Sequence, residues 1–371
     1  MTDRTSELAT DQSLGGLEPV VHFSGAMPTG VSVSRTGRIF VNFPKWGDDV
    51  QFTVAEIRDS ACVAYPDEAT NRTDPNDPAA ALVSVQSIVV DPSDRLWILD
   101  TGSPMFQPTE FGGPKLLCVD LETDKVVKKI LFPQDVALPT TYLNDVRFDL
   151  RRGGGGMAFI TDSSDQGPNG IIVVDLASGE SWRRLHEHPS TKALQPPEFL
   201  PIVEGRPLME RDPDGSAKPV KMGADGIAIG ADGGRLYYCP LASRHLHSVS
   251  IDALIDRSLN DQAVAATVVD EGDKGGGSDG LETDADGNIY ATNYEHNAIL
   301  RLNAGTGQWE TVVHDPRLLW PDTMSVAADG HLYVTANQLH RQAKYQGGQD
   351  LRRKPYTLFR VDLGIRPIEL R

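Results

Sequence analysis

Residues 279–292 read DGLETDADGNIYAT, and residues 322–335 read DTMSVAADGHLYVT. Each stretch is a short strand-like run, a tight Asp-Gly turn and a second run with an aromatic residue at its third position. An Asp-Gly turn between two such runs predicts a β-hairpin. Residues 29–41, 86–99, 144–161 and 225–239 repeat the plan, with the aromatic residues Phe40, Trp97, Phe159, Tyr237, Tyr290 and Tyr333 at matching places. Six copies of one plan predict a repeat fold.

Two more strand-like runs follow each hairpin, for example KLLCVDL and KVVKKILF after the second. Four strands in each of six repeats predict an all-β, six-bladed β-propeller. The last repeat has only three strands after Asp322, and the N-terminal run PVVHFSG (19–25) is expected to supply the fourth and close the ring. We therefore predict a flexible tail over residues 1–17 and a single propeller domain over residues 18–371.

The composition of the chain narrows the range of partners, locations and cofactors that we expect. The formal net charge of −17 disfavours nucleic acid and anionic membranes as partners, since both are negatively charged. No apolar run approaches the roughly 18 residues of a membrane span, and the N-terminus lacks an apolar leader region, so we expect a cytoplasmic protein. Cys62, Cys118 and Cys239 are expected to be free thiols. The glycine-rich runs lack the context of a phosphate loop, so no nucleotide or organic cofactor is expected.

The first position of each repeat carries the strongest functional signal. The innermost strands of a propeller start at the same mouth of the central channel, so these residues should converge on one axis: Thr29, Gln86, Asn144, Asp225, Asp279 and Asp322. Converging carboxylates must be protonated, solvated or neutralised by a cation. We predict that Asn144, Asp225, Asp279 and Asp322 bind Ca²⁺ or another divalent metal, with the three aspartates as catalytic groups. The alternative is that these residues only cap turns.

The second inner strand of each blade ends at the same mouth, where its exit loop adds hydrogen-bonding groups and aromatic rings. Such a rim suits a small polar-aromatic ligand. The predicted ligand-binding residues are Gln86, Asp100, Asp145, Asp162, Asn293, Tyr294, Asn337 and His340. Gly226 and Gly280, one position after the acidic column, should let neighbouring backbones approach closely. The Pro-rich connection from Gln195 to Lys221 is typical of a binding loop or lid.

Several of these segments resemble the Yellow / major royal jelly protein family, over about residues 27–363. The segments are YLNDVRFDL, DGIAIGADGGRLYYCPLASRHLHSV, SDGLETDADGNIYATNYEHNAI and WPDTMSVAADGHLYVTANQLHR. The resemblance implies a small-molecule site at the channel mouth, either in a dopachrome-type tautomerase or in a binder of biogenic amines. The binders' contact residues would correspond to Asn293, Tyr294, Thr335 and Asn337. Characterised members are largely secreted, so the polar N-terminus suggests a bacterial-type intracellular relative.

The repeats also resemble, more distantly, the propellers of gluconolactonase and regucalcin-type lactone hydrolases. That resemblance implies a metal held by Asn144, Asp225 and either Asp279 or Asp322. Thr29 stands where those enzymes carry a glutamate, which is a departure from their pattern.

We consider three functions for this chain, and in each of them the partner is a small molecule. The leading hypothesis is a tautomerase or isomerase of a small cyclic compound, in which a channel carboxylate removes a proton next to a carbonyl and a cation or rim Lys or Arg stabilises the enolate. The second is a divalent-metal-dependent lactone hydrolase. The third is a non-catalytic binder of a cationic amine, held by the acidic ring and by Tyr294 or Trp46.

Overall fold

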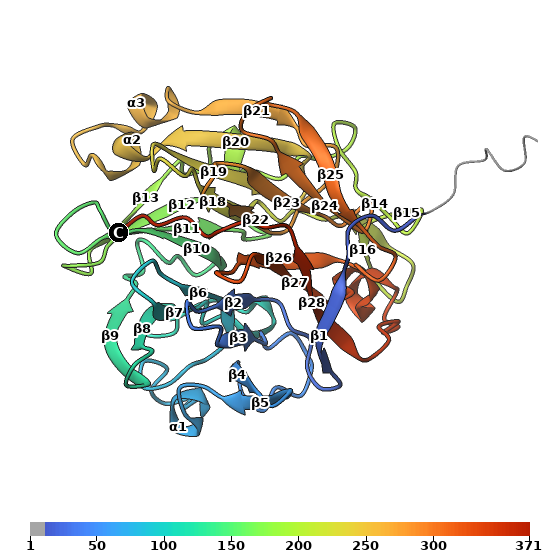
Figure 1. The fold of residues 1–371 in the computed structure, drawn as a ribbon, viewed down its shortest axis with the longest axis horizontal. Helices are drawn as coiled ribbons and strands as arrows, with labels where there is room; N and C mark the ends of the chain where they lie inside the picture. The colour runs from blue at the N-terminus through green and yellow to red at the C-terminus, as the bar shows by residue number, and fades with distance from the viewer. Residues whose placement is uncertain (1–11) are drawn as a thin grey trace, which may run out of the picture.

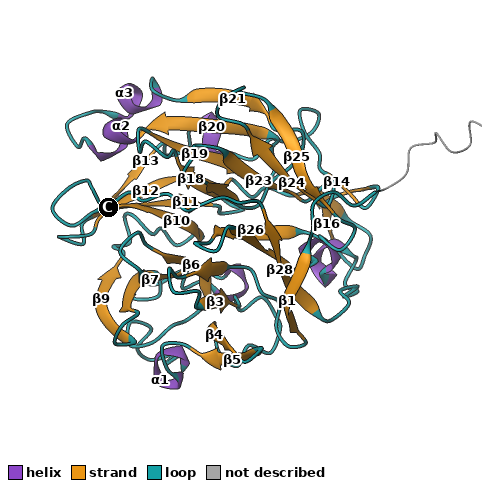
Figure 2. Ribbon diagram, in the orientation of Figure 1, coloured by secondary structure: helices purple, strands orange, loops and turns teal. Residues whose placement is uncertain are grey.

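A computed structural model describes residues 12–371 and confirms the predicted all-β fold (Figure 1). Six four-stranded antiparallel sheets form the blades of the propeller. Strands dominate, and the helices are few and short (Figure 2). Each repeat marked by an aromatic residue in the sequence corresponds to the two inner strands of one blade.

The strands of each blade are given from the channel outward. Blades one to three contain β2 (Val31–Val33), β3 (Ile39–Asn42), β4 (Val54–Arg58) and β5 (Ala61–Ala64); β6 (Val85–Val90), β7 (Arg95–Asp100), β8 (Lys115–Asp120) and β9 (Lys125–Leu131); and β10 (Leu143–Asp149), β11 (Met157–Asp162), β12 (Gly170–Asp175) and β13 (Ser181–Arg184). Blades four and five contain β18 (Ala224–Ile229), β19 (Arg235–Pro240), β20 (His245–Ser250) and β21 (Val269–Asp273); and β22 (Leu281–Thr283), β23 (Ile289–Asn293), β24 (Ala298–Leu302) and β25 (Trp309–His314). Blade six contains β26 (Pro321–Val326), β27 (His331–Ala336), β28 (Tyr356–Asp362) and β1 (Glu18–Phe23).

Blade six closes the ring as predicted. Strand β1 pairs antiparallel with β28, and Phe23 lies opposite Tyr356. The two ends of the chain therefore share one sheet, which covers an edge that would otherwise be open.

The predicted N-terminal tail is too long. Leu14 N–H donates to the carbonyl oxygen of His314 at 2.8 Å, and the side chain of Leu17 is buried. Residues 12–17 therefore lie against blade five, because Leu17 completes an apolar cluster with residues such as Val313. The remainder of the predicted tail, residues 1–11, lies outside the described residues.

Three of the repeated aromatic residues, Trp97, Tyr290 and Tyr333, pack inside the blades and hydrogen-bond to the hairpin turns. Trp97 Nε1 donates to Asp91 Oδ2 at 2.8 Å, and the Tyr290 hydroxyl donates to Asp284 Oδ2 at 2.9 Å. Burying such a ring contributes about 1.5–3 kcal/mol to stability. The turn aspartates thus have a structural role at the end of the channel opposite to the acidic column.

Two insertions meet over the mouth. Residues 195–221 fold into two small hairpins, β14 (Ile202–Val203) with β15 (Arg206–Pro207) and β16 (Met209–Arg211) with β17 (Ala217–Pro219). The segment between β27 and β28 contains the short 3-10 helices η4 (Leu339–Arg341) and η5 (Ala343–Tyr345). The two insertions are joined by His340, whose Nε2–H donates to Glu204 Oε2 at 2.8 Å, and by Lys344, whose Nζ lies 2.7 Å from Glu210 Oε1.

The C-terminal segment crosses the opposite end of the channel (Figure 1). Ala285 N–H donates to the carbonyl oxygen of Arg366 and Leu150 N–H to that of Leu370, both at 2.8 Å. The segment therefore links blade five to blade three, a connection that the repeat pattern did not predict.

The remaining elements lie outside the blade sheets. They are the helices α1 (Glu68–Asn71), α2 (Ile251–Ile255) and α3 (Asp261–Ala265) and the 3-10 helices η2 (Pro104–Phe106) and η3 (Pro189–Thr191). Within residues 12–371, no helix combines the length and the apolar character that a membrane span needs. Cys62, Cys118 and Cys239 are free thiols.

Candidate functional site

The first repeat positions of blades three to six form one cluster at the mouth. Asn144 Nδ2 donates to Asp225 Oδ1 at 2.5 Å. The carboxyl groups of Asp225 and Asp322 each hydrogen-bond to that of Asp279. All four side chains are buried, and the most exposed, Asp279, reaches only 8%. The structure thus brings together the four residues of the predicted metal site, which we call the acidic cluster.

Two glycines make this convergence possible. A Cβ atom on Gly226 would lie 2.4 Å from the carbonyl oxygen of Asp279, and one on Gly280 would lie 2.3 Å from that of Asp322. No real side chain tolerates such contacts with a backbone atom. The inner strands of blades four, five and six therefore approach each other as the sequence predicted.

Threonine hydroxyls tie neighbouring inner strands together. Thr161 Oγ1 donates to the carbonyl oxygen of Asp225 at 2.6 Å, and Thr335 Oγ1 donates to that of Thr29 at the same distance. Each hydroxyl comes from the second strand of one blade and reaches the first strand of the next blade, or the residues just before it in the case of Thr29. These bonds hold the acidic cluster rigidly around the axis.

The three carboxyl groups differ in their pKa values. Burial raises the pKa of Asp279 to about 6. Burial raises the pKa of Asp225 and of Asp322 well above the usual range, and the charge of Asp279 adds to both shifts. Asp279 is hydrogen-bonded to both neighbours, and the Trp320 indole also stabilises its carboxylate. Asp279 is therefore the member that ionises first.

Trp320 fixes the carboxyl group of Asp279 and itself adopts an unusual backbone conformation. Its indole Nε1–H donates to Asp279 Oδ2 at 2.6 Å. The ring stacks on Tyr294, with centroids 4.3 Å apart, and on His340 at 5.8 Å. Trp320 has a φ of +59°, which is rare and strained for a bulky residue. Ring packing and the indole hydrogen bond keep Trp320 in this strained conformation, next to the acidic cluster.

An aromatic pocket of about 550 Å³ lies at the same mouth. Its walls include Trp46, Phe106 and Tyr345. The Trp46 and Phe106 rings stack with centroids 5.5 Å apart, and Phe106 stacks on Tyr142 at 4.4 Å. The Nζ of Lys344 lies 5.0 Å from the centre of the Phe106 ring. The pocket thus combines flat apolar walls with charged groups of both signs, which are Lys344, Arg352, Asp165, Glu210 and Asp350.

Two tyrosines connect this pocket to the acidic cluster. Burial raises the pKa of Tyr345, which lines the pocket, and the charge of Asp279 adds to the rise. Burial also raises the pKa of Tyr142. The Tyr142 hydroxyl accepts from Trp46 Nε1 at 2.8 Å and donates to Gln86 Oε1 at 3.0 Å. Gln86 is thus linked to the pocket through Tyr142.

The carboxyl groups of the acidic cluster are engaged in hydrogen bonds. Within residues 12–371, no three His, Cys, Asp or Glu side chains form a group that could hold one. The carboxyl oxygens instead accept hydrogen bonds from N–H donors on Asn144, Trp320 and Asn337. The Ca²⁺ site stays a prediction.

The predicted rim aspartates have cationic partners. Asp100 forms an ion pair of 2.8 Å with Lys115, and both side chains are fully buried. Asp162 lies 2.9 Å from Arg183. Asp145 and Arg147 form a similar buried pair at 2.9 Å. These acids are neutralised inside the blades.

The other predicted rim residues lie around the acidic cluster. Asn337 Nδ2 donates to Asp322 Oδ2 at 2.6 Å, and the Tyr294 hydroxyl donates to the carbonyl oxygen of Leu241 at 2.6 Å. Asn293 accepts from the backbone N–H of His296 at 3.2 Å. None of the predicted ligand-binding residues lines the aromatic pocket. His340 lines an adjacent cavity of about 1110 Å³ beneath the 195–221 insertion.

Sequence reasoning missed Trp320, Phe106, Lys344 and Tyr345. One signal was available for the first. The position two residues before the start of the repeat carries Tyr142 in blade three and Trp320 in blade six, which are aromatic rings with a polar tip. Both direct that tip at a residue of the first column. Phe106, Lys344 and Tyr345 lie in loops with no counterpart in other repeats, so no periodic signal marks them.

Comparison with known proteins places the chain in a family. Major royal jelly protein 7 of Apis mellifera is 30% identical over 190 residues, which is 50% of this chain and 39% of that protein. Protein yellow of Drosophila melanogaster is 27% identical over 256 residues, 64% of this chain and 43% of that protein. The matched region is thus less than half of these relatives' length.

Solved structures share the fold at low sequence identity. A luciferin-regenerating enzyme aligns with a TM-score of 0.57 and 12% identity over 95% of this chain and 97% of that one. The calcium-binding protein regucalcin of Agrobacterium tumefaciens aligns with a TM-score of 0.56 and 13% identity over 94% and 95%. A putative gluconolactonase aligns with a TM-score of 0.55 and 11% identity over 99% and 98%. The family model "Major royal jelly protein" matches residues 83–370. Because this match covers well over half of the chain, the protein belongs to the major royal jelly protein family.

Proposed function

We propose that this protein is a tautomerase or isomerase of a small cyclic carbonyl compound, aromatic or quinonoid in character. The observation that carries the proposal is the acidic cluster beside an aromatic pocket. Three buried carboxyl groups share hydrogen bonds, and their pKa values are separated by their surroundings. Pairs of carboxyl groups with separated pKa values are typical of proton-transfer catalysis.

Asp279 is the proposed base. With a pKa of about 6, it is mostly ionised at pH 7 and can accept a proton removed from the carbon next to the substrate carbonyl. Asp225 and Asp322 retain their protons and can return one to another atom of the same substrate, so no net proton is gained or lost. Tyr345 lines the pocket, and its hydroxyl is the group proposed to pass the proton between substrate and base.

Lys344, whose ammonium also pairs with Glu210 at 2.7 Å, is the proposed anchor for the substrate's negative charge. Its ammonium lies 5.0 Å from the Phe106 ring centre and 5.6 Å from that of Tyr345. A ring carrying a carboxylate or a developing enolate could lie against these walls with its charge near Lys344. The same contact disfavours the amine binder, because a protein cation already occupies the place over the rings where an amine would bind.

Metal-dependent lactone hydrolysis is the second candidate. The clustering of Asn144 with Asp225, Asp279 and Asp322 favours it, since an oxygen-only set suits hard divalent cations. A fold neighbour is described as a putative gluconolactonase. Elemental analysis of the purified protein, with activity measured before and after chelation, separates the two candidates: loss of activity with the metal supports hydrolysis.

The test of the main proposal uses dopachrome and a sugar δ-lactone as alternative substrates. We expect turnover of the quinonoid compound that survives chelation and is lost in Asp279→Asn. The matched control is Asp100→Glu, which keeps a carboxylate near Lys115, away from the pocket. Turnover of the lactone alone, or full activity in Asp279→Asn, would refute the proposal.

We also propose a cytoplasmic location. The support is that Cys62, Cys118 and Cys239 are all free, as is usual in a reducing compartment. Fractionation of cells that express the protein tests this, and recovery from the medium would contradict it.

A further inference from the structure

The cavity between the two insertions at the mouth, which we call the insertion cavity, is separate from the acidic cluster. It has a volume of about 1110 Å³, which is ample for a small-molecule ligand. The 195–221 insertion and the segment between β27 and β28 both contribute to its walls. It shares Tyr345, Asp350 and Arg352 with the aromatic pocket, but no residue of the acidic cluster lines it.

The insertion cavity carries an excess of positive charge. Its lining contains five arginines against three carboxylates. The arginines are Arg206, Arg211, Arg341, Arg352 and Arg353, and the carboxylates are Glu204, Asp212 and Asp350. In the whole chain, by contrast, 52 acidic residues outnumber 35 basic ones. A cationic lining is therefore opposite to what the composition alone would produce.

Two of the three carboxylates are already paired. Glu204 Oε2 accepts from Arg341 Nε at 2.9 Å, and Asp350 forms an ion pair of 2.6 Å with Arg352. The third, Asp212, is exposed. One carboxylate thus remains in the lining for the three other arginines.

Those three arginines, Arg206, Arg211 and Arg353, form no ion pair within residues 12–371. Arg211 Nη2 donates to the carbonyl oxygen of Pro207 at 3.2 Å, which is a neutral partner. Arg206 and Arg353 are exposed and Arg211 is half-buried, so their guanidinium groups are accessible to a ligand in the cavity. Positive charges from both insertions gather here without neutralisation, which favours an anionic ligand.

The backbone that carries these arginines is held in place. Glu204 and Gly205 have φ values of +48° and +74°, as a tight hairpin turn requires, and this turn positions Arg206 at the start of β15. The buried Gln338 side chain holds Arg353 from both sides: its Nε2 donates to the Arg353 carbonyl oxygen at 2.6 Å, and its Oε1 accepts from the Arg353 N–H at 2.8 Å. Positioning of this kind lowers the entropic cost of binding.

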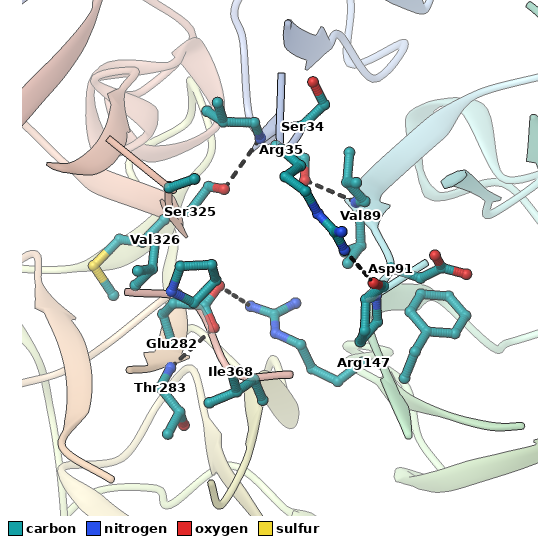
Figure 3. A pocket seen from close by; sticks show the side chains of 18 of the residues that line it. Ser34, Arg35, Val89, Asp91, Arg147, Glu282, Thr283, Ser325, Val326 and Ile368 are labelled. Atoms are coloured by element: carbon teal, nitrogen blue, oxygen red, sulfur yellow. Dashed lines mark hydrogen bonds and ion pairs between the residues drawn. The ribbon is translucent and has the colours of Figure 1, made fainter. Parts of the chain in front are cut away.

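The cavity at the opposite end of the channel lacks this excess of positive charge (Figure 3). Its volume is about 400 Å³, and its lining holds four carboxylates against three arginines. Arg147 lies beside Glu282 in Figure 3, with Arg147 Nη2 and Glu282 Oε2 3.7 Å apart. The aromatic pocket likewise holds three carboxylates against two cations. Of these three cavities, the insertion cavity alone has a net positive lining.

We propose that the insertion cavity binds a phosphorylated small molecule. A phosphate monoester carries about two negative charges at pH 7 and offers three acceptor oxygens, so one group can engage more than one arginine. The planar guanidinium also matches phosphate in bidentate geometry. A carboxylate carries a single charge and would leave more of the lining without neutralisation. The proposal goes beyond the reaction at the acidic cluster and does not depend on it.

Three probes with similar polyol bodies test the chemical class of the ligand: glycerol 3-phosphate, glycerate and glycerol. Each is titrated into the full-length protein and followed by isothermal titration calorimetry. We expect glycerol 3-phosphate to bind at least ~10-fold more tightly than either other probe, because its dianion forms charge-assisted bonds with more than one arginine. Equal affinities of glycerol 3-phosphate and glycerate, or no binding of glycerol 3-phosphate at millimolar concentration, would overturn the proposal.

Three variants locate the binding. Arg206→Gln and Arg353→Gln each remove one charge from an exposed side chain, and each should weaken the binding of glycerol 3-phosphate at least ~10-fold. Arg72→Gln is the matched control, because Arg72 is also exposed but does not line the insertion cavity, and it should leave the affinity unchanged. Unchanged binding in both cavity variants, or equal weakening in Arg72→Gln, would assign the binding to another surface or to net charge alone and would overturn the proposal. Thermal melts confirm that each variant is folded.

Discussion

The inner-strand aspartates Asp225, Asp279 and Asp322 and the exit-loop aspartates Asp100 and Asp162 are all buried, but they differ in their partners. Asp100 and Asp162 each form a close ion pair, with Lys115 and Arg183 respectively. The three inner aspartates have only one another and neutral N–H and O–H donors.

This difference separates structural from functional use of the same residue type. Asp100 accepts from the backbone N–H groups of Val83 and Ser84, at 2.6 and 2.9 Å, so its charge organises a loop. The inner aspartates are buried without a cationic partner. This arrangement is unfavourable, and folding alone does not need it. Sites where such strain is retained are candidates for function.

The largest expected effect is on stability, from Asp100→Asn. The change leaves the buried Lys115 ammonium without its counter-charge, and we expect a loss of about 3 kcal/mol in the free energy of unfolding. Urea denaturation at pH 7 measures it. Asp225→Asn, equally buried but without a cationic partner, is the control and should not destabilise. An unchanged urea midpoint for Asp100→Asn would remove the distinction between the two sets.

The second prediction concerns turnover. Asp225→Asn and Asp279→Asn should each lower kcat by at least about 100-fold, because each removes a proton-transfer group and retains the shape of the side chain. His340→Asn should cost less, since His340 reaches the cluster only through its stacking on Trp320. Steady-state kinetics on the quinonoid substrate decide the matter. Loss of activity in His340→Asn alone would show that the catalytic groups lie at the rim and not in the acidic cluster.

The third prediction is a gain in stability that depends on pH. Burial raises the pKa of Asp322 above its unfolded value of about 3.9, so the folded protein binds more protons and loses stability as the pH rises through that range. Asp322→Asn lacks this penalty and should be more stable than the parent by at least about 1 kcal/mol at pH 8, but not at pH 4. Urea titrations at both pH values test the sign. A gain of equal size at pH 4 would contradict the role of ionisation.

The smallest expected effect is on the pKa of Asp279. Trp320→Phe keeps an aromatic ring but removes the donor that favours the ionised carboxylate, so the pKa of Asp279 should rise above about 6. Carboxyl ¹³C NMR titration measures the shift. Tyr294→Phe is the control, because the hydroxyl that it removes bonds to Leu241 instead. An equal shift in both variants would assign the effect to packing.

Much of the fold and part of the site could be predicted because both follow from the repeat. A fixed spacing determines which end of each inner strand a residue occupies, so Asp225, Asp279 and Asp322 could be assigned to one mouth. Lys344 and Tyr345 could not, because they belong to an insertion present in one blade only. The role of Trp320 depends on a left-handed backbone conformation and on stacking with Tyr294, neither of which is visible in the sequence.

Closure of blade six by β1 has a consequence for biosynthesis. Phe23 and its neighbours leave the ribosome first, yet their partners around Tyr356 follow about 330 residues later. At translation rates of about 5–20 residues per second, β1 stays without its partner strand for roughly 20–70 s. During that interval its apolar side chains Val20, Val21 and Phe23 are uncovered on an unpaired strand, which makes the nascent chain a candidate client for chaperones.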